Sequence, residues 1–106
     1  MANIILGTGL KLLVKVNDID GVSMKDMDFT IEVSGGTLKP VTLLFTKDMC
    51  KPERDGADGH RVPFLTSDLG VGKVSVRVNV NLIDGDFFGG VRPEKIDLDP
   101  NIKIVM

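Results

Sequence analysis

The sequence predicts an all-β fold: an immunoglobulin-like antiparallel β-sandwich of about seven strands, spanning residues 1–106 as a single domain. Three observations predict it. Residues 73–82 alternate apolar and polar side chains without interruption, the period of a strand with one buried and one solvated face. Further short apolar runs recur between Asp- and Gly-rich turns, at the spacing typical of a sandwich. No segment has a helical period long enough for a βαβ crossover.

The first half of the chain contains three predicted strands. Residues 10–16 place leucine and valine on one face and lysine on the other, and residues 29–34 alternate in the same way. Residues 41–46 follow Pro40, whose missing N–H suits the start of a strand. Between the first two strands, residues 23–28 are expected to form one helical turn, too short to contribute to the core.

The second half begins with a weak strand over residues 60–65. Pro63 cannot donate to a ladder, so we expect this strand at a sheet edge. Residues 66–72 form a turn that directs Leu69 inward before the strand at 73–82 begins. The last two predicted strands cover residues 92–98 and 102–105.

The immunoglobulin-like order rests on the turn Asp68-Leu69-Gly70 ahead of a long, strongly alternating late strand. The cysteine pair and the core Trp of antibody domains are absent, since the chain has one Cys and no Trp. The prediction therefore concerns strand order and not the antibody core.

Residues 47–59 predict an exposed charged loop, because they combine many charged side chains with no apolar period. Cys50 and His60 lie in or beside this loop, and we expect both to be exposed to solvent. Zinc needs three or four ligands, and the chain has no second Cys or His. A single Cys also excludes an internal disulfide. No metal site is predicted from this pair.

Asp-Gly runs are the other candidate ligands. They occur at residues 18–21, 55–59 and 84–86, but none completes an EF-hand pattern, and Asp-Gly pairs commonly form hairpin turns. The Gly-containing segments 7–9 and 70–72 lack the lysine and helix of a phosphate loop and are interpreted as turns. We find no catalytic constellation, so no enzymatic activity and no cofactor are predicted.

Composition narrows the class of partner. The formal net charge of −2 gives no reason to expect nucleic-acid or anionic-membrane binding, and no apolar run approaches a membrane span. The chain begins without the positively charged region of a signal peptide, which favours synthesis in a reducing cytoplasm. The absence of Trp and Tyr argues against a glycan-binding platform or a base-stacking surface.

Two features suggest protein contacts. Phe87 and Phe88 lie in a Gly-rich connection, where they either cap the domain's own core or contact a neighbouring chain. Leu13 and Leu44 fall on the polar faces of their strands, as in a protein whose outer surface is partly covered. Phe87 and Phe88 are the candidate interface.

The chain resembles a group of small β-sandwich proteins encoded in phages and prophages of gut Bacteroidales. The resemblance is carried by these segments: residues 10–16, Met27-Asp28-Phe29, residues 66–72, residues 84–87 and Arg92-Pro93-Glu94. It implies a virion component of the head-surface, fibre-base or connector type, present in many copies. We therefore expect a phage structural protein, made in the bacterial host cytoplasm and located in the virion, that binds other virion proteins and forms a homo-oligomer. The alternatives are an adhesin-like module that recognises host-surface glycans and a calcium-stabilised surface domain.

Overall fold

The computed structural model of the protein describes residues 1–52 and 59–106. It is an all-β fold, as predicted, and the helical segments among the described residues are short 3-10 turns. The strands are β1 (Ala2–Ile5), β2 (Gly9–Lys15), β3 (Asp28–Gly35), β4 (Val41–Thr46), β5 (Lys51–Pro52), β6 (Gly59–Leu65), β7 (Gly72–Lys73), β8 (Ser75–Ile83), β9 (Val91–Leu98) and β10 (Ile102–Val105). The 3-10 turns are η1 (Met24–Asp26), η2 (Lys47–Met49), η4 (Thr66–Asp68) and η5 (Phe88–Gly90).

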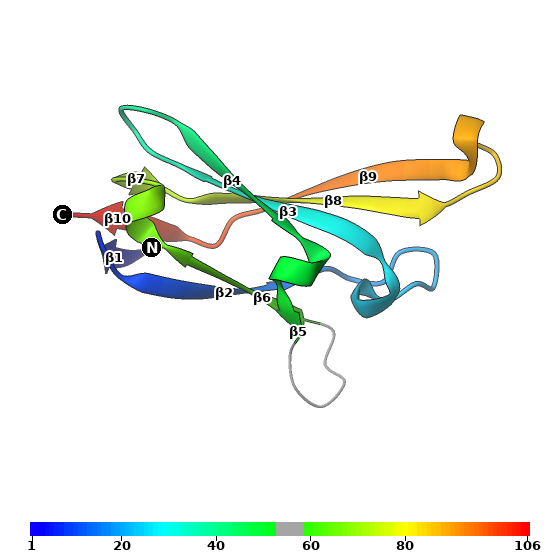
Figure 1. The fold of residues 1–106 in the computed structure, drawn as a ribbon, viewed down its shortest axis with the longest axis horizontal. Helices are drawn as coiled ribbons and strands as arrows, with labels where there is room; N and C mark the ends of the chain where they lie inside the picture. Colours follow the sequence, from blue (N-terminus) through cyan, green and yellow to red (C-terminus); the bar gives the residue numbers. More distant parts are fainter. Residues whose placement is uncertain (53–58) are drawn as a thin grey trace.

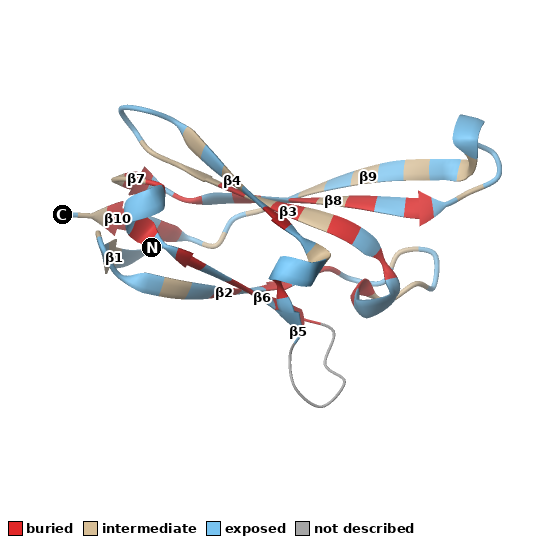
Figure 2. Cartoon of the chain, viewed as in Figure 1, coloured by how far each residue is buried: buried red, intermediate tan, exposed pale blue. Residues whose placement is uncertain are grey.

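The strands form a sandwich of two main layers. The four-stranded sheet β4-β3-β8-β9 is one layer, and the sheet β2-β6-β5 lies opposite it. A third sheet, β1-β10-β7, lies at the end where both termini are found (Figure 1). The core lies between the layers, because the alternating apolar side chains of β3 and β8 are buried on one face only (Figure 2).

The central pair of the core is formed by β3 and β8. They run antiparallel, with Ile31 opposite Val78 and Phe29 opposite Val80. Ile31 and Val78 have no exposed surface at all. The alternation that predicted these strands therefore corresponds to their buried and solvated faces.

The predicted strand at residues 73–82 belongs to two sheets. β7 pairs with β10, whereas β8 pairs with β3 and β9. Between them the Val74 N–H donates to the Ile102 carbonyl at 3.0 Å, and the Val74 side chain is fully buried. The segment thus crosses from one sheet to another without losing its alternation.

The N-terminal strand β1 is absent from the sequence prediction. It pairs with β10 in parallel, from Ala2 opposite Ile102 to Ile5 opposite Val105. The expectation of purely antiparallel sheets is therefore wrong for this pair. Parallel pairing joins two segments that are far apart in the chain, so a local sequence pattern cannot predict the partner of β1.

The immunoglobulin-like strand order stays a prediction. In the two layers, β6 lies between β2 and β5, and β8 lies between β3 and β9. The prediction that the strand containing Pro63 lies at a sheet edge is wrong, because β6 lies between β2 and β5, although β5 pairs with it only opposite His60 and Arg61. At Pro63 the neighbour is β2 alone among the described strands.

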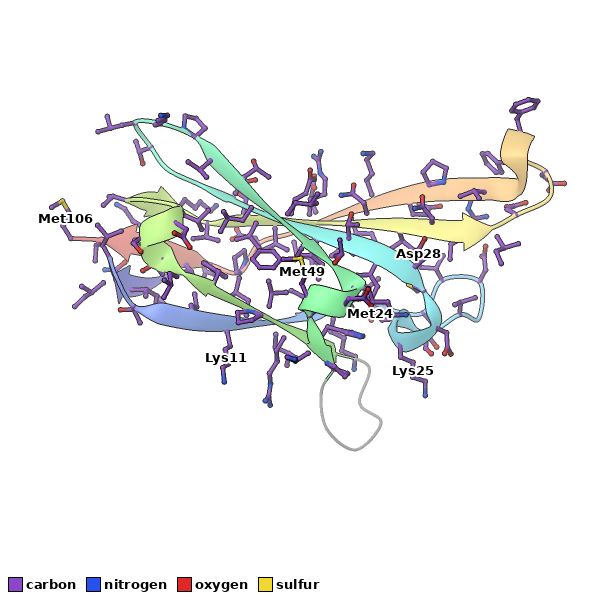
Figure 3. All side chains as sticks on the ribbon, in the orientation of Figure 1. Lys11, Met24, Lys25, Asp28, Met49 and Met106 are labelled. Carbon is purple, nitrogen blue, oxygen red and sulfur yellow. The ribbon has the colours of Figure 1, made fainter. Side chains whose placement is uncertain are left out.

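The turn at residues 23–28 contributes to the core, contrary to expectation. Met24 and Met27 are almost completely buried, at 0% and 2% exposure. Figure 3 shows the Lys25 side chain projecting away from the molecule, whereas Met24 lies within it. A single 3-10 turn is enough to direct two methionines inward, because Ser23 and Met27 on either side of η1 have extended backbone.

Candidate interaction surface

Phe87 and Phe88 lie at the tip of the β8–β9 hairpin. Figure 1 shows the hairpin as an arm that ends in η5, beyond the layer formed by β2, β6 and β5. Phe87 is 45% exposed and Phe88 is fully exposed, so the alternative in which both fill the domain's own core is wrong. Ile83 and Val91 face each other across the hairpin and are also exposed. We call Ile83, Phe87, Phe88 and Val91 the tip patch.

The backbone of the tip is closed on itself. The Asp84 N–H donates to the Gly90 carbonyl at 2.9 Å, and the Gly90 N–H donates to the Phe87 carbonyl at 2.8 Å. Gly89 and Gly90 have φ values of +85° and +75°, a region that favours glycine. The Gly-Gly pair therefore permits a tight turn that presents the two Phe side chains to solvent.

Arg92 fixes the tip to the body of the protein. Its guanidinium contacts Asp84 at 3.0 Å and Glu94 at 3.2 Å, and it also donates to Asp20. The Arg92 side chain is 22% exposed, so these ion pairs are only partly screened by solvent. The hydrogen bond to Asp20, followed by the nearby carboxylates, raises the pKa of Arg92 above its ordinary value. This cluster joins the hairpin to the loop that carries Asp20.

Two of the three Asp-Gly runs each contribute an aspartate that pairs with Arg92. Asp20 from the first run and Asp84 from the third run contact the guanidinium through their carboxylates, and Asp84 accepts a further hydrogen bond from the Asp86 N–H at 3.0 Å. The run at 55–59 lies almost wholly outside the described residues. In the described part of the chain, no three Cys, His, Asp or Glu side chains are grouped so that they could hold a metal ion.

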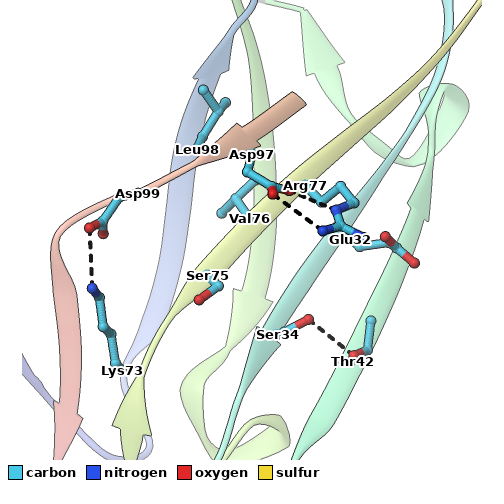
Figure 4. A pocket seen from close by; sticks show the side chains of 10 residues that line it. All are labelled: Glu32, Ser34, Thr42, Lys73, Ser75, Val76, Arg77, Asp97, Leu98 and Asp99. Carbon is cyan, nitrogen blue, oxygen red and sulfur yellow. Dashed lines mark hydrogen bonds and ion pairs between the residues drawn. The ribbon is translucent and has the colours of Figure 1, made fainter. Parts of the chain in front are cut away.

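A second candidate surface is a shallow polar groove on the outer face of the four-stranded sheet. The groove has a volume of about 590 Å³, and Figure 4 shows its lining. Arg77 donates two hydrogen bonds to Asp97, at 2.6 and 3.2 Å, and Lys73 pairs with Asp99 at 3.2 Å. The bond from Arg77 holds the pKa of Asp97 below its ordinary value. The groove is therefore a surface of paired charges and hydroxyl groups.

Cys50 and His60 are buried, so the prediction that they are exposed to solvent is wrong. They are 3% and 4% exposed. The Cys50 Sγ donates to the Thr46 carbonyl at 3.4 Å, and the His60 and Phe29 rings pack edge to face with centroids 4.9 Å apart. Burial raises the pKa of the Cys50 thiol, which disfavours the reactive thiolate.

The predicted exposed loop at residues 47–59 is correspondingly shorter. Residues 47–49 form η2, residues 51–52 form β5, and Gly59 already belongs to β6. Residues 53–58 lie outside the described residues. Charge alone misled the prediction, because the two ends of the segment pair with each other through β5 and β6, and β6 also pairs with β2.

Thr66 is a buried polar residue that sequence reasoning did not identify. Its hydroxyl accepts a hydrogen bond from the Gly7 N–H at 2.9 Å and donates to the Thr8 carbonyl at 3.0 Å. The Thr8 N–H also donates to the Ile5 carbonyl at 3.1 Å, so residues 5–8 form a turn, and Gly9 already belongs to β2. The role of Thr66 is structural: it joins the turn after β6 to the β1–β2 connection.

Sequence reasoning also missed two members of the tip patch and the residue that fixes it. Ile83 continues the alternation of β8 on the solvated face, and an apolar residue at that position is the signal that could have identified it. The role of Arg92 had no sequence signal, because Asp20 is distant in the chain. Leu13 and Leu44 are exposed, as their positions on the polar faces predicted.

Comparisons of the chain with protein-family models, curated proteins and solved structures found no match. Within residues 1–52 and 59–106, no helix has the length and apolar character needed to cross a membrane.

Proposed function

We propose that this protein is a non-enzymatic structural component of a phage virion, of the capsid-surface, head-fibre or connector type, and that it acts by protein–protein assembly. The observation that carries the proposal is the tip patch. It places two Phe side chains, an Ile and a Val on a projecting hairpin where the protein itself does not cover them. Large apolar side chains gathered in this way are typical of an interaction site.

The energetics favour a contact at the tip. Fully burying a Phe side chain stabilises a contact by about 1.5–3 kcal/mol. The turn is already closed by backbone hydrogen bonds and fixed by Arg92, so little conformational entropy remains to be lost on binding. Phe88 is the expected centre of the contact, because its side chain is the most exposed of the four.

The proposed contact can be tested with Phe88→Ser and a matched control. Leu38 is almost fully exposed at the β3–β4 turn, so Leu38→Ser removes an apolar side chain of similar exposure outside the tip patch. We expect Phe88→Ser to weaken self-association or capture of virion proteins in analytical ultracentrifugation, while Leu38→Ser leaves both unchanged. Equal effects of the two variants would contradict a specific contact at the tip.

The virion location has a separate test. Mass spectrometry of purified particles from a host that carries the gene should detect the chain at a copy number comparable with other structural proteins. Its absence from particles, with the chain present in the host lysate, would overturn the virion proposal whatever the result at the tip.

Recognition of a host-surface glycan remains a second candidate function, favoured by the polar groove. Ser34, Thr42 and Ser75 line the groove together with the paired charges, which suits a ligand rich in hydroxyl groups. A glycan array should then show binding that Ser34→Val and Thr42→Val reduce. An array without binding would remove this candidate and leave the assembly proposal unaffected.

A further inference from the structure

We infer that the free edge of β9 pairs antiparallel with β9 of a second copy, in one register, with Ile96 opposite Ile96 of the second copy. This inference rests on the proposed assembly function and adds a second contact, for which the partner is another copy of the chain. It concerns a strand edge and is independent of the tip patch.

The hydrogen-bond pattern of the hairpin identifies the groups at the free edge. The Asp84 N–H donates to the Gly90 carbonyl, and Leu82 lies opposite Arg92 two residues further along. Opposite pairs alternate between hydrogen-bonded and non-hydrogen-bonded in an antiparallel ladder. The even-numbered residues of β9 therefore direct their backbone groups toward β8, and the odd-numbered residues direct theirs outward.

Pro93 supports this assignment. It is an odd-numbered residue of β9, and a proline in a strand is found where its missing N–H would face away from the ladder. β9 is the terminal strand of its sheet in the described part of the chain. In residues 1–52 and 59–106, the outward N–H groups of Lys95 and Asp97 make no backbone hydrogen bond outside the strand ladders.

The side chains select one register. A two-fold axis at Glu94, Lys95 or Asp97 would place a charged residue opposite its own copy, which is destabilising. An axis at Pro93 would remove both N–H donors from the central pair. An axis at Ile96 places Lys95 opposite Asp97 of the second copy on the outer face, twice by symmetry. Among these five axes, only the one at Ile96 places opposite charges across from each other and keeps the N–H donors of the central pairs.

The inner face of β9 has room for the contact between the two Ile96 side chains. Ile96 is half-buried and lines a hollow of about 350 Å³ between β9 and residues 15–19. The two Ile96 side chains would meet there as a non-hydrogen-bonded pair, flanked on both sides by a Lys95–Asp97 pair. Each flanking pair would exchange both of its backbone hydrogen bonds. A lysine on an edge normally prevents pairing, and here the neighbouring aspartate offsets its charge in a single register.

A cross-linking experiment reads the register directly. Non-hydrogen-bonded partners in an antiparallel pair have Cα atoms about 4.5 Å apart, within the range that a disulfide spans. Ile96→Cys in the full chain should therefore form a disulfide-linked dimer under mild oxidation. Lys95→Cys is the matched control: its side chain is more exposed, but in this register it faces Asp97 of the second copy. The native Cys50 is buried and should not react.

A second measurement tests the charge pairs. Lys95→Asp and Asp97→Lys should each weaken self-association about tenfold, because each replaces two opposite-charge pairs by like-charge pairs. Asp97→Lys also removes the Arg77–Asp97 pair within each copy. An equimolar mixture of the two variants should recover the lost association, since each copy then supplies the charge that the other needs.

The expected results are an Ile96→Cys dimer without a Lys95→Cys dimer, and recovery in the mixture. Equal cross-linking of both variants, a dimer from Lys95→Cys alone, no recovery, or a wild-type chain that stays monomeric at millimolar concentration would overturn the inference. The proposed function can fail while this inference holds. An Ile96-linked dimer could form although the chain is absent from virus particles, or although Phe88→Ser leaves its association unchanged.

Discussion

Two short turns flank the same end of the four-stranded sheet and differ in the burial of their apolar side chains. The turn at 24–27 precedes β3 and lies in a strongly charged segment, yet Met24 and Met27 are buried. The turn at 84–90 follows β8 and contains two adjacent Phe residues, yet both are exposed. Composition alone would predict the reverse. The comparison shows that a turn is buried by what lies across from it and not by its own hydrophobicity.

Lys47 illustrates the difference. Its ammonium group donates to the Lys25 and Met27 carbonyls, both at 2.7 Å, and it lies 5.6 Å from the centre of the Phe29 ring. A residue that follows β4 thus fixes the Met24–Met27 turn from outside. Arg92 fixes the hairpin tip through its ion pair with Asp84, while the apolar side chains of the tip remain exposed to solvent.

The largest expected effect comes from placing the same charge in both turns. Met24→Asp would bury a carboxylate without a partner, at a cost of several kcal/mol, which is comparable with the whole stability of a small domain. Phe88→Asp changes a solvated side chain and should alter the free energy of unfolding by less than about 0.5 kcal/mol. Urea unfolding followed by circular dichroism measures both. A destabilised Phe88→Asp chain would show that the tip belongs to the core.

An intermediate effect is expected at Lys47. Lys47→Met removes two charge-assisted hydrogen bonds from the buried turn and should lower the free energy of unfolding by about 1 kcal/mol. Lys25→Met is the matched control, because Lys25 lies on the same turn with its side chain in solvent. The interpretation fails if both variants show the same urea midpoint.

A smaller effect is expected at Arg92. Arg92→Met should lower global stability only slightly, since its ion pairs lie near the surface. Amide hydrogen exchange should become faster at residues 84–90, because the turn loses its attachment to Asp20. Arg77→Met removes a comparable ion pair on the polar groove and should leave exchange at the tip unchanged.

The smallest effect concerns pH. The pKa of Asp97 is lowered by its hydrogen bond from Arg77, and that of Asp99 by the Asn101 N–H and then by Lys73. A folded-state pKa below the unfolded value of about 3.9 contributes stability at higher pH, and this contribution is lost as the pH falls through the folded-state value. Thermal melting at pH 6 and pH 3 should show the loss. Asp97→Asn should reduce this difference, whereas Phe88→Ser should not.

Much of the fold was predictable because strand alternation is local. The alternation in residues 29–34 and 73–82 shows directly which face is buried, and the exposure of Leu13 and Leu44 followed from the same kind of pattern. The burial of Leu69 was predicted from the turn at residues 66–72. The candidate interface at Phe87 and Phe88 came from an apolar pair in a Gly-rich connection. Its extension to Ile83 and Val91 needed the hairpin register, which places these two residues opposite each other.

The sequence by itself determined that this is a β-sandwich, since a side-chain period of two residues allows only one buried face for each strand. Tertiary structure alone decided which turns the opposite layer covers. It buried Cys50, His60 and the Met24–Met27 turn, brought β1 beside β10, and left Phe88 in solvent. The physical reason is that burial and parallel pairing depend on segments far away in the chain, whose positions no local pattern contains.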